Sequence, residues 1–148
     1  MTRGRAPEGR AVNVPRDYPT IQQAVNAATA GDMIYIDPGE YTEQVTVEKD
    51  LTLKGSGPES TIIKSPSVLS PDSFGKRFII EVKKEAMVTM TALTVRGPGG
   101  CPHWAIGVMG GATLDLSHAS IKSIRQSPEC TLDGGTGILV GLPPHLAE

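Results

Sequence analysis

The sequence predicts an all-β fold, a right-handed parallel β-helix of about four coils closed at its N-terminal end by one helix. The chain of 148 residues contains 17 glycines and 12 prolines, and its short apolar runs are separated by turn residues. In residues 31–57 the connections are too short for crossover helices and lack the Asn-Gly or Asp-Gly loops of hairpins. Similar phrases also recur at the intervals of a solenoid. Strands that neither cross over nor fold back must coil.

The segment 20–30, "TIQQAVNAATA", is the exception to the β pattern. Apolar residues from Ile21 to Ala28 follow the i, i+3, i+4, i+7 spacing of an amphipathic helix. Thr20 is a suitable N-cap residue, and Gly31 is a suitable stop. We therefore expect a helix over 20–30 that caps the solenoid.

From Gly31 onward the apolar period changes to two, with runs at 33–36, 45–47 and 51–53. Related phrases follow at 88–97, "VTMTALTVRG", and 112–123, "ATLDLSHASIKS". Val95 lies 26 residues before Ile121, and Ile106 lies 32 residues before Ile138. The uneven intervals indicate insertions at 65–76 and 96–104. The residues expected to stack inward are Ile34, Val47, Leu53, Ile80, Val95, Ile106 and Ile121.

Charge and length exclude several classes of function. The net charge is −2, so no basic face is expected for nucleic acid. No stretch approaches the roughly 20 apolar residues that span a membrane. The N-terminus has no signal-peptide core, which favours a cytoplasmic protein. We expect a flexible segment at 1–11 and a single domain at 12–148.

Residues 12–57 resemble a known family. "VPRDYPTIQQAVNAATAGDMIYIDPGEYTEQVTVEKDLTLKGSG" is similar to the opening of right-handed parallel β-helix proteins of the pectin-lyase-like superfamily, which includes pectin methylesterases. The resemblance implies the fold, but enzymes and non-enzymes share this opening. The esterase motifs resembling Q-D-T-L, D-F-I-F-G and G-R-P-W are absent. Because these motifs are missing, we expect this chain to have no esterase activity despite the resemblance.

The carboxylates do not form an evident acid–base pair. Glu43, in the family's G-x-Y-x-E phrase, is expected to be a solvent-facing strand residue without a catalytic partner. The other acidic residues are scattered, although coiling could bring Glu81 and Asp115 together. A carbohydrate-active enzyme of the pectin esterase, lyase or glycosidase type, or a fragment of one, therefore remains an alternative. With three histidines and no C-x-x-C motif, no metal and no cofactor are expected.

The insertion "GGCPHWAI" is the best candidate for a binding loop. Trp104 and His103, together with Tyr41, could form a non-catalytic carbohydrate-binding site for an oligosaccharide. Cys101 and Cys130 lie 29 residues apart, about one coil, and could therefore be neighbours. A disulfide would imply export, and reduced thiols are expected in a cytoplasmic protein.

The end of the chain, "TGILVGLPPHLAE", still reads as a strand, with no second capping helix. An uncovered strand tends to recruit another copy. Ile138, Val140 and Leu142 are therefore predicted to form a homodimer interface through the C-terminal coil. Alternatively, the tail covers the end, or the chain is part of a longer β-helix. The function expected from the sequence is a non-catalytic binding or self-association module.

Overall fold

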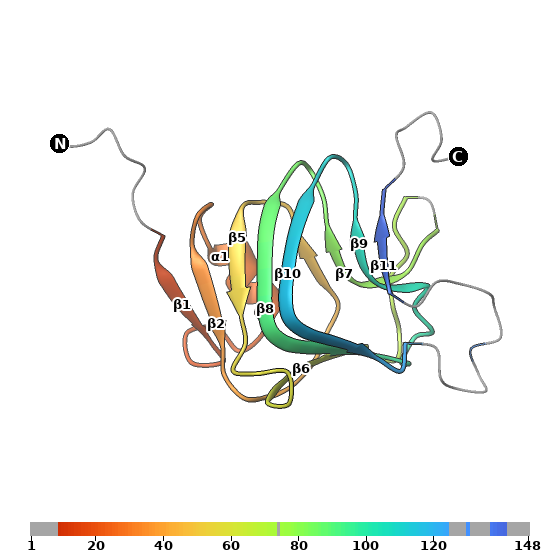
Figure 1. Ribbon diagram of the computed structural model, residues 1–148, viewed down its shortest axis with the longest axis horizontal. Helices are drawn as coiled ribbons and strands as arrows, with labels where there is room; N and C mark the ends of the chain where they lie inside the picture. Colours follow the sequence, from red (N-terminus) through yellow and green to blue (C-terminus); the bar gives the residue numbers. More distant parts are fainter. Residues whose placement is uncertain (1–8, 74, 125–129, 131–136, 142–148) are drawn as a thin grey trace.

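The computed structural model describes residues 9–73, 75–124, 130 and 137–141. The strands wind into a right-handed parallel β-helix with three faces, which confirms the predicted fold (Figure 1). Every strand pair in the described residues is parallel. The four coils are β2–β3–β4, β5–β6–β7, β8–β9 and β10–β11, preceded by β1 and α1.

Two of the faces belong to one seven-stranded sheet. The first face contains β1 (Ala11–Val14), β2 (Met33–Ile36), β5 (Leu51–Lys54) and the first halves of β8 (Met87–Arg96) and β10 (Thr113–Lys122). The second contains β3 (Gly39–Thr42), β6 (Thr61–Lys64) and the second halves of the two long strands. Ala92 and His118 have φ of 62° and 49°, so β8 and β10 bend at aligned positions and pass from one face to the other (Figure 1).

The third face is a four-stranded sheet. It contains β4 (Val45–Val47), β7 (Phe78–Val82), β9 (Trp104–Val108) and β11 (Ile138–Val140). In the pairing register Val95 aligns with Ile121, and Ile106 aligns with Ile138. Both repeat intervals found in the sequence therefore join residues that pair directly in adjacent coils.

The core is a set of apolar columns that run through the coils. Six of the predicted inward residues are buried, with at most 2% of their surface exposed: Ile34, Val47, Leu53, Ile80, Val95 and Ile106. Ile121, in the last coil, is partly exposed and packs against the core from one side. An inward side chain is therefore fully buried only where the next coil stacks on it.

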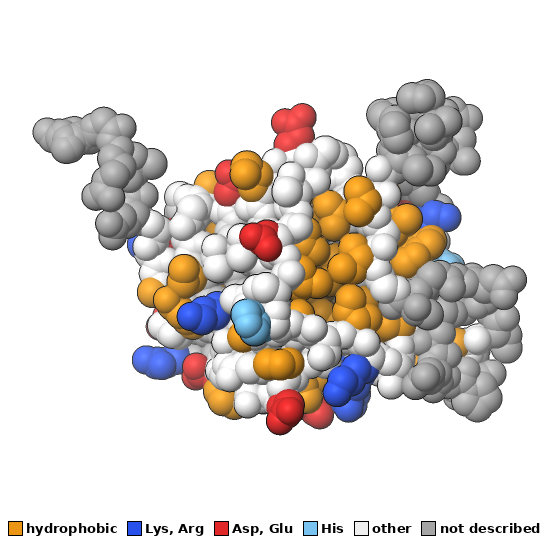
Figure 2. Space-filling model, viewed as in Figure 1, with side chains coloured by type: hydrophobic (Ala, Val, Ile, Leu, Met, Phe, Trp, Pro, Cys, Tyr) orange, Lys and Arg blue, Asp and Glu red, His pale blue; other side chains and the backbone are white. Residues whose placement is uncertain are grey.

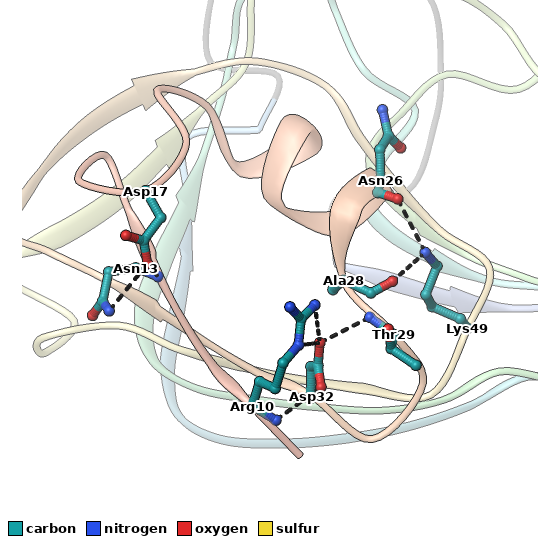
Figure 3. Close-up of polar contacts among 8 residues, drawn as sticks. All are labelled: Arg10, Asn13, Asp17, Asn26, Ala28, Thr29, Asp32 and Lys49. Atoms are coloured by element: carbon teal, nitrogen blue, oxygen red, sulfur yellow. Dashed lines mark hydrogen bonds and ion pairs between the residues drawn. The ribbon is translucent and has the colours of Figure 1, made fainter.

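Helix α1 (Ile21–Ala27) packs against β1, β2 and β4 and closes the N-terminal end. The Thr20 side chain accepts a hydrogen bond from the Gln23 N–H at 3.1 Å, as expected of the N-cap. The helix is shorter than the predicted 20–30 because Ala28 is already extended, with φ −72° and ψ 154°. Lys49 Nζ donates to the Ala28 carbonyl at 2.7 Å and holds the chain in this conformation (Figure 3).

Side chains of the first coil anchor the helix. The two carboxylate oxygens of Glu43 accept hydrogen bonds from the Ile21 and Gln22 N–H groups, both at 2.9 Å. The expectation that Glu43 simply faces solvent is therefore wrong. The Gln22 side-chain amide in turn accepts from the Thr46 N–H at 2.7 Å and donates to the Thr46 carbonyl at 3.2 Å. The Gln22 side chain thus forms the two main-chain hydrogen bonds to Thr46 that a neighbouring strand would otherwise form.

Asp32 ties the start of β1 to the end of the cap. Its buried carboxylate accepts from the main-chain N–H groups of Thr29 and Arg10, both at 2.8 Å, and from the Arg10 guanidinium at 3.1 Å (Figure 3). The hydrogen bonds from Thr29 and Arg10 hold the pKa of Asp32 below its usual value despite burial. The ionised carboxylate is therefore part of the folded structure.

Replacing Glu43 with Gln should lower the free energy of unfolding by about 1–2 kcal/mol, because one helix N–H loses its acceptor and the charge at the helix N-terminus is lost. Urea unfolding of Glu43→Gln measures the change. The matched control is Glu59→Gln, at an exposed position, which should change stability by less than about 0.5 kcal/mol. Equal effects of the two variants would contradict the anchoring role.

Replacing Asp32 with Asn should cost about 2 kcal/mol at neutral pH, since hydrogen bonds to a charged acceptor are lost. A carboxyl with a lowered folded-state pKa contributes its stabilisation fully above its unfolded value, here 3.8. The contribution is lost as the pH falls through the folded-state pKa. Unfolding of both proteins at a series of pH values should therefore show that the difference between their free energies of unfolding becomes smaller in acid. A difference that does not change with pH would exclude a role for the Asp32 charge.

Candidate functional site

Trp104 and His103 lie where β9 begins, next to the start of β7. Phe78 pairs with Trp104, and their ring centroids are 5.9 Å apart. His103 pairs with Arg77 through its main-chain N–H, which donates to the Arg77 carbonyl at 2.8 Å, and through Nδ1, which accepts from the Arg77 N–H at 3.0 Å. Lys76 Nζ lies 5.6 Å from the Trp104 ring. The Phe78 ring and the Lys76 ammonium group thus both lie near the Trp104 indole.

The segment 65–76 leads from β6 to β7, and Gln44 fixes it to the third face. The Gln44 side chain exchanges two hydrogen bonds with the main chain of Ser70, at 2.9 and 3.0 Å. It also donates to the Phe78 carbonyl at 2.9 Å. The segment and the β4–β7 surface line a half-open cavity of about 210 Å³, which we call the Glu81 cavity. Its lining residues are Gln44, Thr46, Ser70, Pro71, Asp72, Lys76, Phe78, Glu81 and Lys83.

Gly107 leaves space for the aromatic residue of this site. A Cβ at position 107 would lie only 2.6 Å from the Phe78 ring. Gly107 pairs with Glu81 in the sheet. Glycine at this position therefore allows the Phe78 ring to lie against β9, where it links the cavity to Trp104.

Glu81 is the most perturbed carboxyl of the cavity. Its side chain is only 13% exposed, and its carboxylate lies 3.9 Å from Lys83 Nζ. Burial raises the pKa of Glu81, Lys83 opposes the shift, and the charges of Asp72 and Glu48 increase it. A partly buried carboxyl with a raised pKa beside a second carboxylate is a feature of binding and catalytic sites.

The structure does not bring Tyr41 into this site. Tyr41 belongs to β3 of the other sheet, is 9% exposed, and donates its hydroxyl hydrogen bond to the Asp37 carbonyl at 2.8 Å. Burial, with the charges of Asp37 and Glu43, raises the pKa of this hydroxyl. The expectation of a sugar-binding Tyr41 is therefore corrected, because its ring is part of the core and has no free face for stacking.

Glu81 and Asp115 are not neighbours either, since Asp115 lies on β10 of the seven-stranded sheet. In that sheet it aligns with Thr89 and Thr52. A hollow of about 460 Å³ there is lined by Gly31, Asp50, Leu51, Thr52, Met87, Val88, Thr89, Thr113 and Asp115. Asp50 accepts from the Met87 N–H at 2.9 Å, and no lysine or arginine is among these lining residues. The carboxylate that does approach Glu81 is Asp72, from the insertion.

Cys101 and Cys130 form a disulfide, with Cα atoms 5.2 Å apart. The expectation of reduced thiols is therefore wrong. The bridge ties the insertion before β9 to the chain beyond β10. Disulfides persist mainly in oxidising compartments outside the cytoplasm.

The predicted interface residues lie in or beyond the last strand. Ile138 and Val140 are 40% and 66% exposed, and Leu142 lies outside the described residues. Within the described ranges there is no group of three metal-ligating side chains. No helix in the same ranges is long and apolar enough to cross a membrane.

No family model matches the chain. It resembles three solved structures of pectin methylesterases. One is a complex with a hexasaccharide, with a TM-score of 0.63, 19% identity, and coverage of 91% of this chain and 46% of that one. The second, from Erwinia chrysanthemi, has a TM-score of 0.62, 17% identity, and coverage of 92% and 46%. A variant in complex with a hexasaccharide has a TM-score of 0.56, 19% identity, and coverage of 77% and 49%.

A cell surface glycoprotein of Methanothermus fervidus is 39% identical over 64 residues, which are 42% of this chain and 10% of that protein. The chain thus spans about half the length of the solved esterases and a tenth of the glycoprotein. The fold is a right-handed parallel β-helix, like that of these solved esterases. Identities below one fifth to the esterases establish the fold and not their activity.

Reduction of the disulfide, whose cysteines are separated by 29 residues, should destabilise the protein by about 3.6 kcal/mol, as expected for a closed loop of this length. Thermal unfolding with and without dithiothreitol measures the effect. The double variant Cys101→Ser/Cys130→Ser should unfold at the reduced protein's midpoint and not respond to the reductant. Two free thiols in the untreated protein, with a midpoint that dithiothreitol leaves unchanged, would contradict the bridge.

Proposed function

We propose that the chain is a non-catalytic binding module that takes one sugar unit of a carbohydrate in the Glu81 cavity, beside Trp104. The proposal depends on one observation: polar and aromatic side chains lie next to each other at one place on the third face. Phe78 lines the cavity and stacks on Trp104, and Lys76 both lines the cavity and lies over the indole.

The lining has the chemistry that a sugar requires. Sugar hydroxyls donate and accept hydrogen bonds, and the cavity offers lysine donors, carboxylate acceptors and hydroxyl groups that do both. The apolar face of a sugar ring packs well on an indole. Ligand pockets usually exceed about 300 Å³, so a cavity of about 210 Å³ suits one sugar unit rather than an enclosed chain.

The comparisons support this reading without deciding it. Two of the similar esterases are described as complexes with a hexasaccharide, and the partial relative is a cell surface glycoprotein. Together with the Cys101–Cys130 bridge, this favours a protein that works outside the cytoplasm. We therefore replace the cytoplasmic expectation with an extracytoplasmic location.

A carbohydrate-active enzyme remains a second candidate because of one observation. Glu81, with its raised pKa, and Asp72 line the same cavity. Glycoside hydrolases use two carboxyl groups on either side of the bond that is cleaved. The binding proposal and the enzyme candidate differ in whether a bound oligosaccharide is cleaved.

A panel of hexasaccharides of neutral, amino and uronic sugars tests the proposal by thermal shift. A member present at about 100 times its dissociation constant should stabilise the protein by about 2.7 kcal/mol, or several degrees. Trp104→Ala should abolish the shift, whereas Tyr35→Ala, at an exposed tyrosine of β2, should retain it. No shift with any member, or a shift that survives in Trp104→Ala, would refute the site.

The same mixtures, analysed by mass spectrometry after incubation, distinguish binding from catalysis. The proposal expects intact hexasaccharides. Cleavage by the unmodified chain that disappears in Glu81→Gln would establish the second candidate instead.

A further inference from the structure

The C-terminal end of the solenoid exposes the columns that the coils otherwise bury. On the third face one column contains Ile80, Ile106 and Ile138, which are 1%, 0% and 40% exposed. The neighbouring column contains Val82, Val108 and Val140, at 0%, 5% and 66%. Each column is covered until the last coil. Ile138 and Val140 therefore lie at inward positions, and no described strand stacks on them.

The seven-stranded sheet shows the same pattern. Met90 and Val95 in β8 are 0% and 1% exposed, whereas their partners Leu116 and Ile121 in β10 are partly exposed. Figure 2, in the orientation of Figure 1, shows hydrophobic side chains gathered between the positions of β10 and β11. Leu114, Leu116, Ile121, Ile138 and Val140 define what we call the end face.

The strand edge at this end is also free within the described residues. β10 pairs with β8 alone, and β11 pairs with β9 alone. β10 is ten residues long, an edge of about 33 Å at about 3.3 Å per residue. Unpaired main-chain groups beside an apolar surface favour another strand edge as the partner. The other end of the solenoid is closed by α1.

The area of the end face suits a specific but modest interface. Each half of β10 spans about 16 Å and sheets pack about 10 Å apart, so the face with its side chains measures roughly 25 by 20 Å. Two such faces would bury about 1,000 Å² in total, the lower limit for a specific contact between proteins. Association in the micromolar range is therefore expected.

The charges of β10 match a two-fold arrangement of identical chains. Asp115 lies in the first half of the strand and Lys122 in the second, with the bend at His118 between them. A two-fold axis through the bend exchanges the halves, so the acidic half of one copy lies against the basic half of the other. The net charge of −2 adds little repulsion.

We propose that the end face docks a second copy of this chain through a two-fold axis across the bend of β10. The contact joins the open columns of the two solenoids and pairs their β10 edges in antiparallel orientation. The contact does not cover the Glu81 cavity, which lies on the outer surface of the third face of each copy. The proposal does not depend on carbohydrate binding.

Sedimentation velocity of the 148-residue chain from about 1 to about 100 micromolar tests the proposal. The chain should sediment increasingly as a dimer across this range. Val140→Lys should weaken association by about a hundredfold, because it buries an uncompensated charge at the contact. Val68→Lys is the matched control, since Val68 is a 79% exposed valine outside the end face, and it should leave the dimer unchanged.

Both substitutions are at exposed positions, so the variants should keep the unfolding midpoint and circular dichroism spectrum of the original chain. Ile138→Lys provides a second test of the same surface and should also give a monomer. A chain that remains monomeric at about 100 micromolar would overturn the proposal. A dimer that neither Val140→Lys nor Ile138→Lys weakens would equally overturn it.

Discussion

The stacking of inward side chains from one coil to the next is the constraint on which the rest of this structure depends. A strand displaced by one residue would turn its apolar side chains outward, so each coil must repeat the register of the one before it. The column of Ile80, Ile106 and Ile138 satisfies this requirement although its members are separated by segments of different length. Differences in length are therefore accommodated between the strands and not within them.

The candidate site is a consequence of that constraint. The insertion at 65–76, before β7, lies at the third face, and Gln44 fixes it there by replacing a main-chain partner for Ser70 and Phe78. It brings Asp72 beside Glu81 without altering the register of Glu81 in the sheet. The strands thus provide a rigid floor, and the insertion provides chemistry that the repeat itself lacks.

The sequence predicted the parts of the structure that follow from periodicity. The intervals from Val95 to Ile121 and from Ile106 to Ile138 are true coil repeats because apolar period and register have the same physical cause. The role of Glu43 was not predictable in this way, since its partners are main-chain N–H groups about 20 residues earlier. The cavity around Glu81 also escaped prediction, because its residues come from separate strands and an insertion of irregular conformation.

The two ends of the solenoid differ in how their apolar columns and unpaired main-chain groups are covered. At the N-terminal end, Glu43 and Lys49 bond main-chain groups of the helix and its C-cap, and Gln22 of the helix bonds Thr46 of β4. Polar main-chain groups and apolar columns are therefore covered together. At the other end, the described residues cover neither β10's free edge nor Ile138 and Val140. In the proposed dimer, contact between identical chains through this end would be isologous and would stop at two copies, because α1 covers the other end of each solenoid. Helix α1 therefore covers the core at one end and, in the proposed dimer, would also prevent further copies from adding there.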